Sequence, residues 1–319
     1  QMGHHTVVQL LIVHGAAVNQ ATTDDGVTPL YMAAYTGQVE VVRLLLENGA
    51  AVNHGRTDLG ASPLLVAAQE GHVAVVQMLL ENGATPTQAR TDNGISPLFV
   101  AAEFGRIDVA RVLLESGAAV NQARTDDGAT PLSISAQEGH VEMVRVLLAH
   151  GASVNQATID DGSTPLHTAT WDYHVDVVNV LLANGATVNQ ATTDTGTTPL
   201  LIAAYDGLLD VVQVLLENGA AVNQARTDDG GTPLHSAAWQ GHSEVAQLLA
   251  VFGAKIASHT ILSHTPHSIA AQFEHSALAA WFAAVDTWSP LQIAAGCRLF
   301  RAATTAVKLG VVDPEQGGV

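Results

Sequence analysis

The sequence predicts an all-α solenoid of stacked helix-turn-helix units, in which a β-hairpin finger projects between successive units. The first observation is a Thr-Pro-Leu or Ser-Pro-Leu triplet that recurs at steps of 34 residues. The second is the phrase around it: Asp-x-Gly precedes most triplets, and Ala-Ala, Gly-His and an aliphatic run ending in Gly-Ala follow. Self-similarity at such a period is typical of a repeat array. The triplets begin at Thr28, Ser62, Ser96, Thr130, Thr164, Thr198 and Thr232.

The first helix of each unit is predicted to start at the triplet. Thr28 suits the N-cap, and Pro29 suits the first helical position, where no N–H donor is needed. Ala33 and Ala34 are small enough to let neighbouring helices approach closely. Gly37 is expected to end the helix, because glycine tolerates the left-handed conformation found at helix C-termini.

The second helix is predicted over residues 38–48, because Val42 and Leu45 belong to an apolar set on one face. An extended connector follows, and Asp-Gly pairs such as Asp25-Gly26 are a strong hairpin signal, which predicts the finger. One helix pair cannot bury its apolar face alone, so stacking of neighbouring units has to supply the core.

This repeated phrase resembles the ankyrin repeat. The resemblance is carried by residues 28–50, TPLYMAAYTGQVEVVRLLLENGA, and equally by residues 232–254, TPLHSAAWQGHSEVAQLLAVFGA. It extends over residues 1–254 and includes seven near-perfect copies. Ankyrin units usually have about 33 residues, so we expect a slightly longer finger here.

The limits of the pattern predict four segments. Residues 1–20 match the back half of a unit, which suggests that the chain begins inside a longer array, and residues 21–254 hold the seven repeats. Residues 255–311 are expected to form a degenerate repeat and a C-terminal capping unit, because terminal repeats need a polar outer face. Residues 312–319 are expected to be a disordered tail.

The charge of the chain restricts its partners. It has 30 acidic and 12 basic residues, a formal net charge of −18. Such a surface repels phosphate backbones and anionic membranes, so we expect neither nucleic acid nor membrane as a partner. It attracts basic protein surfaces instead. The lone cysteine, Cys297, cannot form an internal disulfide, which fits a cytoplasmic location and leaves the nucleus open. We expect a monomer.

The residues that vary between units are the candidates for recognition. In ankyrin proteins the two positions after Ala-Ala lie on the concave face beside the fingers, so the resemblance implies a binding surface there. Tyrosine and tryptophan, which are enriched at binding hot spots, occupy several of these positions, although they could simply cover the helix layer. The candidates are Tyr35, Gln69, Glu103, Phe104, Gln137, Trp171, Asp172, Tyr205, Asp206 and Trp239.

The finger tips carry aspartates in every copy, with Asp25, Asp127, Asp161 and Asp229 as the candidates. They could form an acidic comb that attracts a basic peptide. The alternative is turn chemistry, because aspartate bonds its own backbone in such turns, and the strict periodicity favours this alternative. Arginines two residues before a tip aspartate are expected to neutralise part of the charge: Arg56, Arg90, Arg124 and Arg226.

Neither metal binding nor catalysis is predicted. Six of the 15 histidines recur at whole-repeat spacing, too far apart to share an ion, and the family resemblance gives them structural hydrogen bonds near the turns: His4, His72, His140, His167, His235 and His242. The closer group from His259 to His275 lacks a paired-ligand spacing with cysteine. Gly-x-Ser-x-Gly, phosphate-loop and HExxH motifs are absent, so we expect no enzyme activity, metal or cofactor. Cys297 is expected to pack in the cap.

A modification remains open. Ankyrin repeats include substrates of asparagine hydroxylation at the asparagine before the finger, with a leucine eight residues upstream. The acidic residue often found two positions before this asparagine is replaced here by Ala, Ser or Thr, which favours a purely structural role. The matching residues are Asn19, Asn53, Asn121, Asn155, Asn189 and Asn223.

Two functions are consistent with these features. The first is a protein-interaction scaffold or adaptor that binds a protein or peptide along the concave face and the finger tips. The alternative is a structural spacer or targeting arm of a larger protein whose active domain lies elsewhere.

Overall fold

The computed structural model describes residues 5–285, which fall into two compact units divided between Ala186 and Thr187. The unit before the division contains α1 (His5–Val13), α2 (Pro29–Tyr35), α3 (Val39–Glu47), α4 (Pro63–Glu70), α5 (Val73–Glu81), α6 (Pro97–Glu103), α7 (Ile107–Glu115), α8 (Pro131–Gln137), α9 (Val141–Ala149), α10 (Pro165–Trp171) and α11 (Val175–Ala183). The unit after it contains α12 (Pro199–Tyr205), α13 (Leu209–Glu217), α14 (Pro233–Gln240), α15 (Ser243–Val251), α16 (Pro266–Gln272) and α17 (Ser276–Val285).

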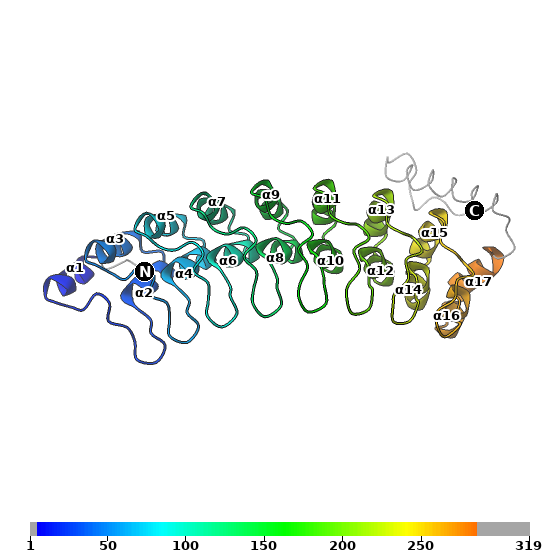
Figure 1. Ribbon diagram of the computed structural model, residues 1–319, viewed down its shortest axis with the longest axis horizontal. Helices are drawn as coiled ribbons and strands as arrows, with labels where there is room; N and C mark the ends of the chain where they lie inside the picture. The colour runs from blue at the N-terminus through cyan, green and yellow to red at the C-terminus, as the bar shows by residue number, and fades with distance from the viewer. Residues whose placement is uncertain (1–4, 286–319) are drawn as a thin grey trace. The chain divides into compact units, whose positions relative to one another are not determined.

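Each unit is built of two rows of helices (Figure 1). In the first unit an inner row of α2, α4, α6, α8 and α10 packs helix against helix, and an outer row of α3, α5, α7, α9 and α11 does the same. In the second unit α12, α14 and α16 form the inner row, while α13 and α15 form the outer row. Every inner helix packs on the helix that follows it, so the predicted helix-turn-helix repeat is confirmed.

The inner helices begin where the sequence predicts. The Thr28 hydroxyl accepts the N–H of Tyr31 at 3.1 Å, and Pro29 is the first helical residue. Four other inner helices have a reciprocal cap, in which the third helical residue also bonds the cap residue's backbone N–H. That third residue is Ser133, His167, His235 or Ser268. Because the cap satisfies otherwise orphaned backbone donors, it fixes the start of each inner helix.

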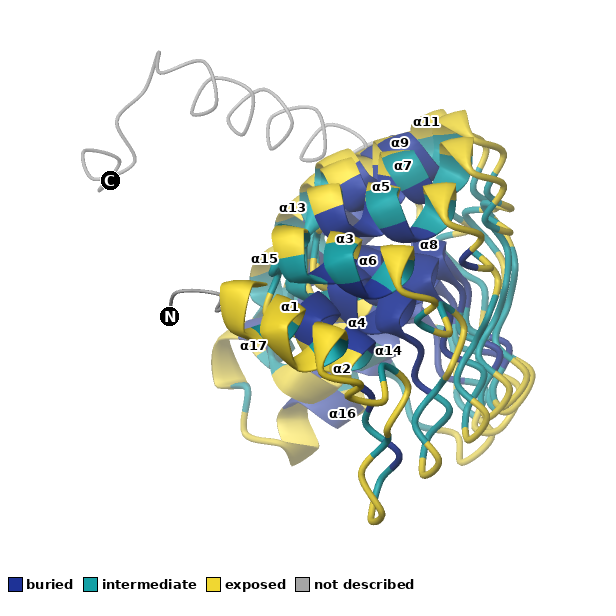
Figure 2. Ribbon diagram, turned by 90° about the vertical axis from the view of Figure 1, so that its left-hand side faces the viewer, coloured by how far each residue is buried: buried dark blue, intermediate teal, exposed yellow. Residues whose placement is uncertain are grey.

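The core is aliphatic and lies between the two rows (Figure 2). Ala34 of the inner row and Val42 of the outer row have no exposed surface, and the equivalent residues of the next six repeats, up to Ala238 and Ala246, are equally buried. Phe282 of α17 is also fully buried, at a position where earlier repeats place leucine. The α1 helix differs, because it contains no buried residue and most of its large apolar side chains are at least half exposed.

The fingers differ from the predicted β-hairpins. One backbone hydrogen bond closes the first finger, from Thr22 N–H to the carbonyl of Val27 at 3.0 Å. A β-ladder would also need a bond from the Val27 N–H back to the Thr22 carbonyl. The Val27 N–H instead donates to the Thr22 hydroxyl at 2.8 Å. In the finger of residues 124–129 the return N–H of Ala129 donates to the Asp127 carboxylate at 2.9 Å. The described residues therefore contain hydrogen-bonded turns and no strand.

Single backbone bonds join neighbouring fingers. Thr57 N–H donates to the carbonyl of Asp25 at 3.0 Å, and Thr227 N–H donates to Thr195 at 2.9 Å. Asn53 adds two side-chain bonds to the next repeat, one to the Gly83 carbonyl at 3.1 Å and one from Thr85 N–H at 2.9 Å. These bonds set the spacing of the repeats on the finger side of the inner row.

The histidines of the Gly-His element, and His275 at the equivalent position after Glu274, join repeats at the C-terminal ends of the inner helices. His72 Nε2 lies 3.0 Å from the carbonyl oxygen of Tyr35 in the preceding repeat, and His140, His242 and His275 make the same contact. In one repeat Arg106 replaces the histidine and donates from Nε to the Gln69 carbonyl at 3.0 Å. The structural role that the family resemblance implies for these histidines is confirmed.

Part of the segment predicted as degenerate repeat and cap is visible as α16 and α17. Residues 286–311, which include Cys297, and the expected tail of residues 312–319 lie outside the described residues. Across residues 5–285, each helix is too short or too polar to cross a membrane.

Candidate functional site

The candidate recognition residues lie at the ends of the inner helices, and most are accessible. Trp171 is 68% exposed, and Trp239 is 45% exposed. Gln69 and Glu103 are half-buried. The remaining candidates are all exposed: Tyr35, Phe104, Gln137, Asp172, Tyr205 and Asp206. The structure thus leaves large aromatic side chains accessible at these positions.

In the first unit, a groove of about 580 Å³ lies between the fingers and the ends of the inner helices α8 and α10. Trp171 lines it, together with Gln137 and Thr168. Among the described residues that line it, the carboxylates far outnumber the guanidinium of Arg124. The six carboxylates are Glu103, Asp127, Glu138, Asp160, Asp161 and Asp172.

The Arg124 guanidinium forms ion pairs with aspartates of its own finger. It forms a close ion pair with Asp127, lies 3.4 Å from Asp126 and sits 5.4 Å from the ring centroid of Phe99. The hydrogen bond from Arg124 holds the pKa of the Asp127 carboxyl below its ordinary value. Arg124 therefore offsets mainly the charge of its own finger, and it is the single guanidinium, beside six carboxylates, among the described residues that line the groove.

Glu103 lies between helix and finger, and burial raises the pKa of its carboxyl. Arg124 opposes this shift, whereas the negative charge of Glu138 adds to it. A cation that entered the groove would lower this pKa again, because it would stabilise the ionised carboxylate. The charge of the Glu103 carboxyl therefore depends on which charged groups lie in the groove.

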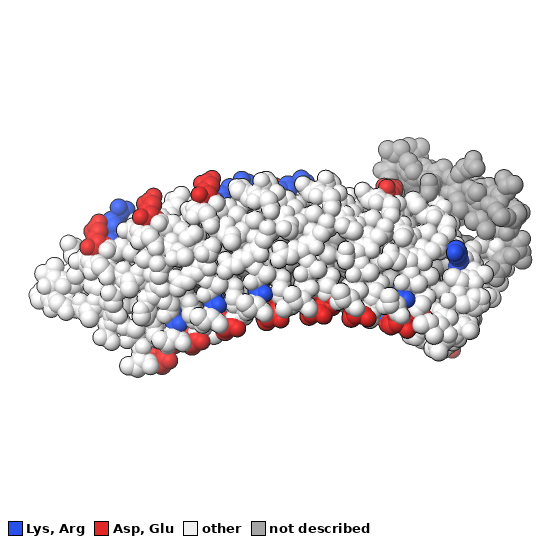
Figure 3. All heavy atoms as spheres, viewed as in Figure 1, with Lys and Arg blue, Asp and Glu red and all other residues white. Residues whose placement is uncertain are grey.

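The tip aspartates have the turn role that the sequence suggested as the alternative. Asp25 accepts the hydroxyl of Thr22 at 2.5 Å, and this hydrogen bond is the main cause of the lowered pKa of its carboxyl. Asp161 accepts Ser163 N–H and the Thr158 hydroxyl. Carboxylates nevertheless line the edge formed by the fingers (Figure 3), so turn chemistry and an acidic surface coexist.

The second unit has a smaller groove of about 380 Å³ with different chemistry. Trp239 and Tyr205 line it beside Leu262 and Ile269. The Trp239 ring packs against Phe273, with ring centroids 4.2 Å apart and planes inclined by 40°. This groove is mainly apolar.

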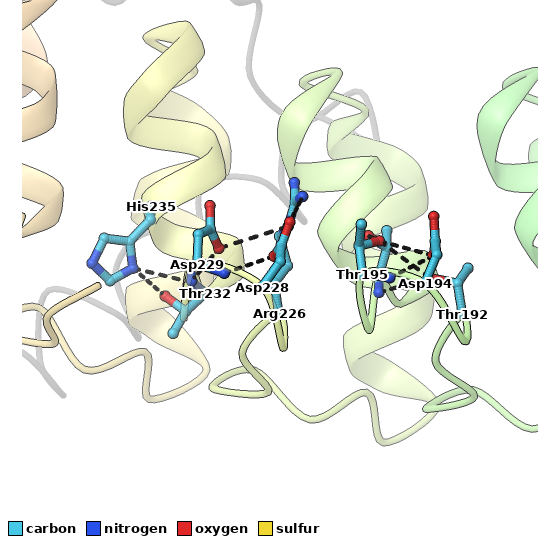
Figure 4. Close-up of polar contacts among 10 residues, drawn as sticks. Thr192, Asp194, Thr195, Arg226, Asp228, Asp229, Thr232 and His235 are labelled. Carbon is cyan, nitrogen blue, oxygen red and sulfur yellow. Dashed lines mark hydrogen bonds and ion pairs between the residues drawn. The ribbon is translucent and has the colours of Figure 1, made fainter. Parts of the chain in front are cut away.

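The charged residues of this second groove are paired. Figure 4 shows Arg226 reaching Asp228, and the Nη2–Oδ2 distance is 2.5 Å. Asp229 accepts the N–H of Gly231 at 2.7 Å and lies 3.7 Å from Arg226. His235 belongs to the helix cap with Thr232, and burial lowers the pKa of its imidazole. Little free charge remains at the floor.

Tyr173 has a strained backbone beside the first groove. Its φ is +64°, in the left-handed region, where most other repeats place a glycine such as Gly139 or Gly207. Its side chain is 55% exposed. Backbone strain of this kind concentrates at functional sites, and here it lies two residues after Trp171.

The predicted candidates separate into three groups. The first groove brings together Glu103, Gln137, Trp171, Asp172, Asp127 and Asp161. The second brings together Tyr205, Trp239 and Asp229. Neither groove includes Tyr35, Gln69, Phe104, Asp206 or Asp25.

Sequence reasoning missed Phe273 and Leu262. The signal for Phe273 was present, because it stands at the second position after the Ala-Ala pair of the degenerate repeat. Leu262 lies where earlier fingers carry an acidic tip. Within residues 5–285, no cluster of three or more histidine, cysteine, aspartate or glutamate residues is placed to hold a metal ion.

Comparison with known families agrees with this architecture. A family described as ankyrin repeats (3 copies) matches residues 1–90, 53–124, 119–192 and 188–260. No curated protein matches the chain. The matched ranges cover most of the sequence and coincide with the helix pairs and fingers described above. The chain therefore belongs to the ankyrin repeat family.

Proposed function

We propose that the chain is a protein-interaction scaffold or adaptor, monomeric and cytoplasmic, that binds a partner with a basic surface. Ankyrin repeats are generally protein-interaction modules, and the family is typically non-catalytic. The proposed binding surface is the side on which the inner helices meet the fingers, the concave face of an ankyrin array.

The acidic groove of the first unit carries the proposal. Six carboxylates line it, and its one guanidinium among the described residues, that of Arg124, is paired with Asp127. The groove is therefore complementary to lysine and arginine side chains. Complementary charge accelerates association and selects the partner. Trp171 supplies an exposed ring, against which a cation or an aliphatic stem can pack. Tryptophan is also among the residues enriched at binding hot spots.

The test begins with a partner captured by the full chain and then purified. Trp171→Ala should weaken its binding at least tenfold, about 1.4 kcal/mol, as expected of a hot-spot residue. Val13→Ala is the matched control, because it also truncates an exposed apolar side chain but lies on α1, away from the groove.

The measurement is the dissociation constant by isothermal titration calorimetry at two salt concentrations. Equal affinities for the two variants would contradict binding at this groove and would favour the spacer or targeting arm.

A further inference from the structure

We propose that the groove of the second unit is an anchor site for one bulky apolar side chain of a protein partner, flanked in the partner's sequence by lysine or arginine. The inference rests on the proposed function and deepens it, because it gives the second groove a different ligand chemistry from the first. Four observations carry it.

Four of the residues that line the groove have large aliphatic or aromatic side chains. Ile269 is buried beneath it, and Tyr205 and Trp239 line it from the ends of two successive inner helices. Phe273, which directly follows α16, packs against the Trp239 ring. Leu262 forms the finger side and is 74% exposed. Burying these surfaces under an apolar side chain would be favourable, at roughly 25 cal/mol per Å².

The finger beside the groove departs from the repeat in one informative way. Ile261 N–H donates to the carbonyl of Asp229, just as Thr227 N–H donates to Thr195 one repeat earlier. This equivalence places Leu262 where the preceding finger carries Asp228. An isobutyl group therefore stands where Asp228, in the preceding repeat, pairs with Arg226. The finger has exchanged a charged contact for an exposed apolar one.

Three polar side chains that line the groove already have partners, namely Asp229, Arg226 and His235. Asp229 is bonded to its own turn, and Arg226 is paired with Asp228. The Nε2 atom of His235 lies 3.2 Å from the carbonyl oxygens of Ser258 and His264. Because these groups are satisfied by the protein, an apolar ligand would not have to break a hydrogen bond or leave a charge unpaired.

The charge at the rim selects the residues next to the anchor. Asp229 lines the groove and Asp228 precedes it on the same finger, and both residues are exposed. Arg226 offsets part of this charge, and the carboxylates remain in excess. Basic residues on either side of an apolar anchor complement this rim. An anchor flanked by acidic residues would be repelled.

The experiment uses the full chain and synthetic peptides of the form acetyl-Lys-Lys-Xaa-Lys-Lys-amide. Xaa is phenylalanine, leucine or alanine, and a fourth peptide has phenylalanine between glutamates. Binding is followed by NMR through the indole N–H signals, because Trp171 lies in the first groove and Trp239 in the second. One titration therefore reports on both grooves separately.

We expect the phenylalanine and leucine peptides to shift the Trp239 signal with at least tenfold higher affinity than the alanine peptide. The glutamate peptide should bind weakly. Leu262→Asp, which restores the residue type of the preceding finger, should abolish this discrimination. Ile159→Asp is the matched control, because Ile159 is an equally exposed aliphatic residue in a finger of the first unit, and it should leave the Trp239 response unchanged.

Other outcomes would overturn the inference. Equal Trp239 responses to phenylalanine and alanine peptides, with a Trp171 response to all lysine peptides, would reject the anchor site and leave the proposed function standing. No response at either tryptophan would reject both. A Trp239 shift that follows protein concentration without peptide would mean that a second copy of the chain fills the groove, which also rejects the inference.

Discussion

Thr232 and His235 cap α14 through a reciprocal contact that fixes the state of the imidazole. The backbone N–H of Thr232 donates to His235 Nδ1 at 3.2 Å, so Nδ1 must be unprotonated. The ring proton then lies on Nε2, which faces the carbonyl oxygens of Ser258 and His264. If Nδ1 were protonated, its N–H would face the Thr232 N–H, and the hydrogen bond that closes the cap would be lost.

This contact predicts a pH-dependent stability. Burial lowers the folded-state pKa of His235 below the ordinary value of 6.5, so the unfolded chain binds the proton more strongly. The contribution of His235 to the free energy of unfolding is therefore complete above about pH 6.5, and it decreases as the pH falls toward the folded-state pKa. Urea unfolding between pH 8 and pH 5 measures the effect.

His235→Ser isolates the contribution, because Ser133 and Ser268 form the same reciprocal cap in other repeats. The variant should keep the helix start and show a shallower loss of unfolding free energy on acidification. Identical pH profiles for the variant and the native chain would show that this histidine does not titrate as argued.

The asparagines before the fingers should stabilise the contact between repeats. Asn53→Ala removes two hydrogen bonds to the next repeat, so we expect a loss of about 2 kcal/mol, at about 1 kcal/mol per bond. Asn53→Asp keeps the acceptor and should lose about half. Asn48→Ala is the control, because the Asn48 side chain bonds Leu44 in its own helix. Hydrogen exchange at Thr85 N–H reports the local opening, and equal protection in Asn53→Ala and Asn48→Ala would refute the prediction.

Tyr173→Gly should increase stability. A left-handed conformation costs a residue other than glycine roughly 1–2 kcal/mol, and part of this gain is lost to the greater freedom of glycine in the unfolded chain. We expect a net gain of about 1 kcal/mol in the free energy of unfolding from urea titration. Tyr173→Ala removes the same ring but keeps the positive φ, so a similar gain in that variant would trace the effect to the exposed ring.

The acidic groove predicts a salt-dependent affinity for basic ligands. Glu103→Gln with Glu138→Gln should weaken binding of the acetyl-Lys-Lys-Ala-Lys-Lys-amide peptide at Trp171 several-fold at low salt. The difference should shrink near 1 M salt, where the screening length falls to about 3 Å. Glu81→Gln with Glu115→Gln changes the net charge equally at the ends of the outer helices α5 and α7. If this control weakened binding as much, net charge rather than the groove would be responsible.

The sequence predicted the repeat because its signals are local. Thr28 and Pro29 specify a helix start within one turn, and the same triplet does so in every copy. The β-hairpin predicted for each finger is seen only as a turn, because the Asp-Gly signal specifies the turn but not the hydrogen-bonded ladder of the two strands. The Thr22 hydroxyl takes the N–H of Val27 that a second rung would need. That competition is between side chain and backbone, which a pattern of residue types does not show.

The candidate site was predicted only in part. Trp171 and Trp239 could be found as variable aromatic residues in an otherwise constant repeat. The different surroundings of the two tryptophans could not be predicted, because each groove combines residues from three successive repeats. Leu262 and Phe273 stand in the degenerate repeat, where the pattern that marks equivalent positions is weakest.

The bonds between fingers make the repeats interchangeable. Within each of the two units, every finger after the first donates one backbone N–H to the carbonyl of the finger before it, as the pairs Thr57–Asp25 and Thr91–Leu59 show. A duplication or deletion of 34 residues inside one unit would leave the donors of its remaining fingers with acceptors of the same kind. Genetic recombination can therefore change the number of repeats without exposing an unpaired edge. The grooves, which depend on particular neighbours, would be lost or moved by the same event.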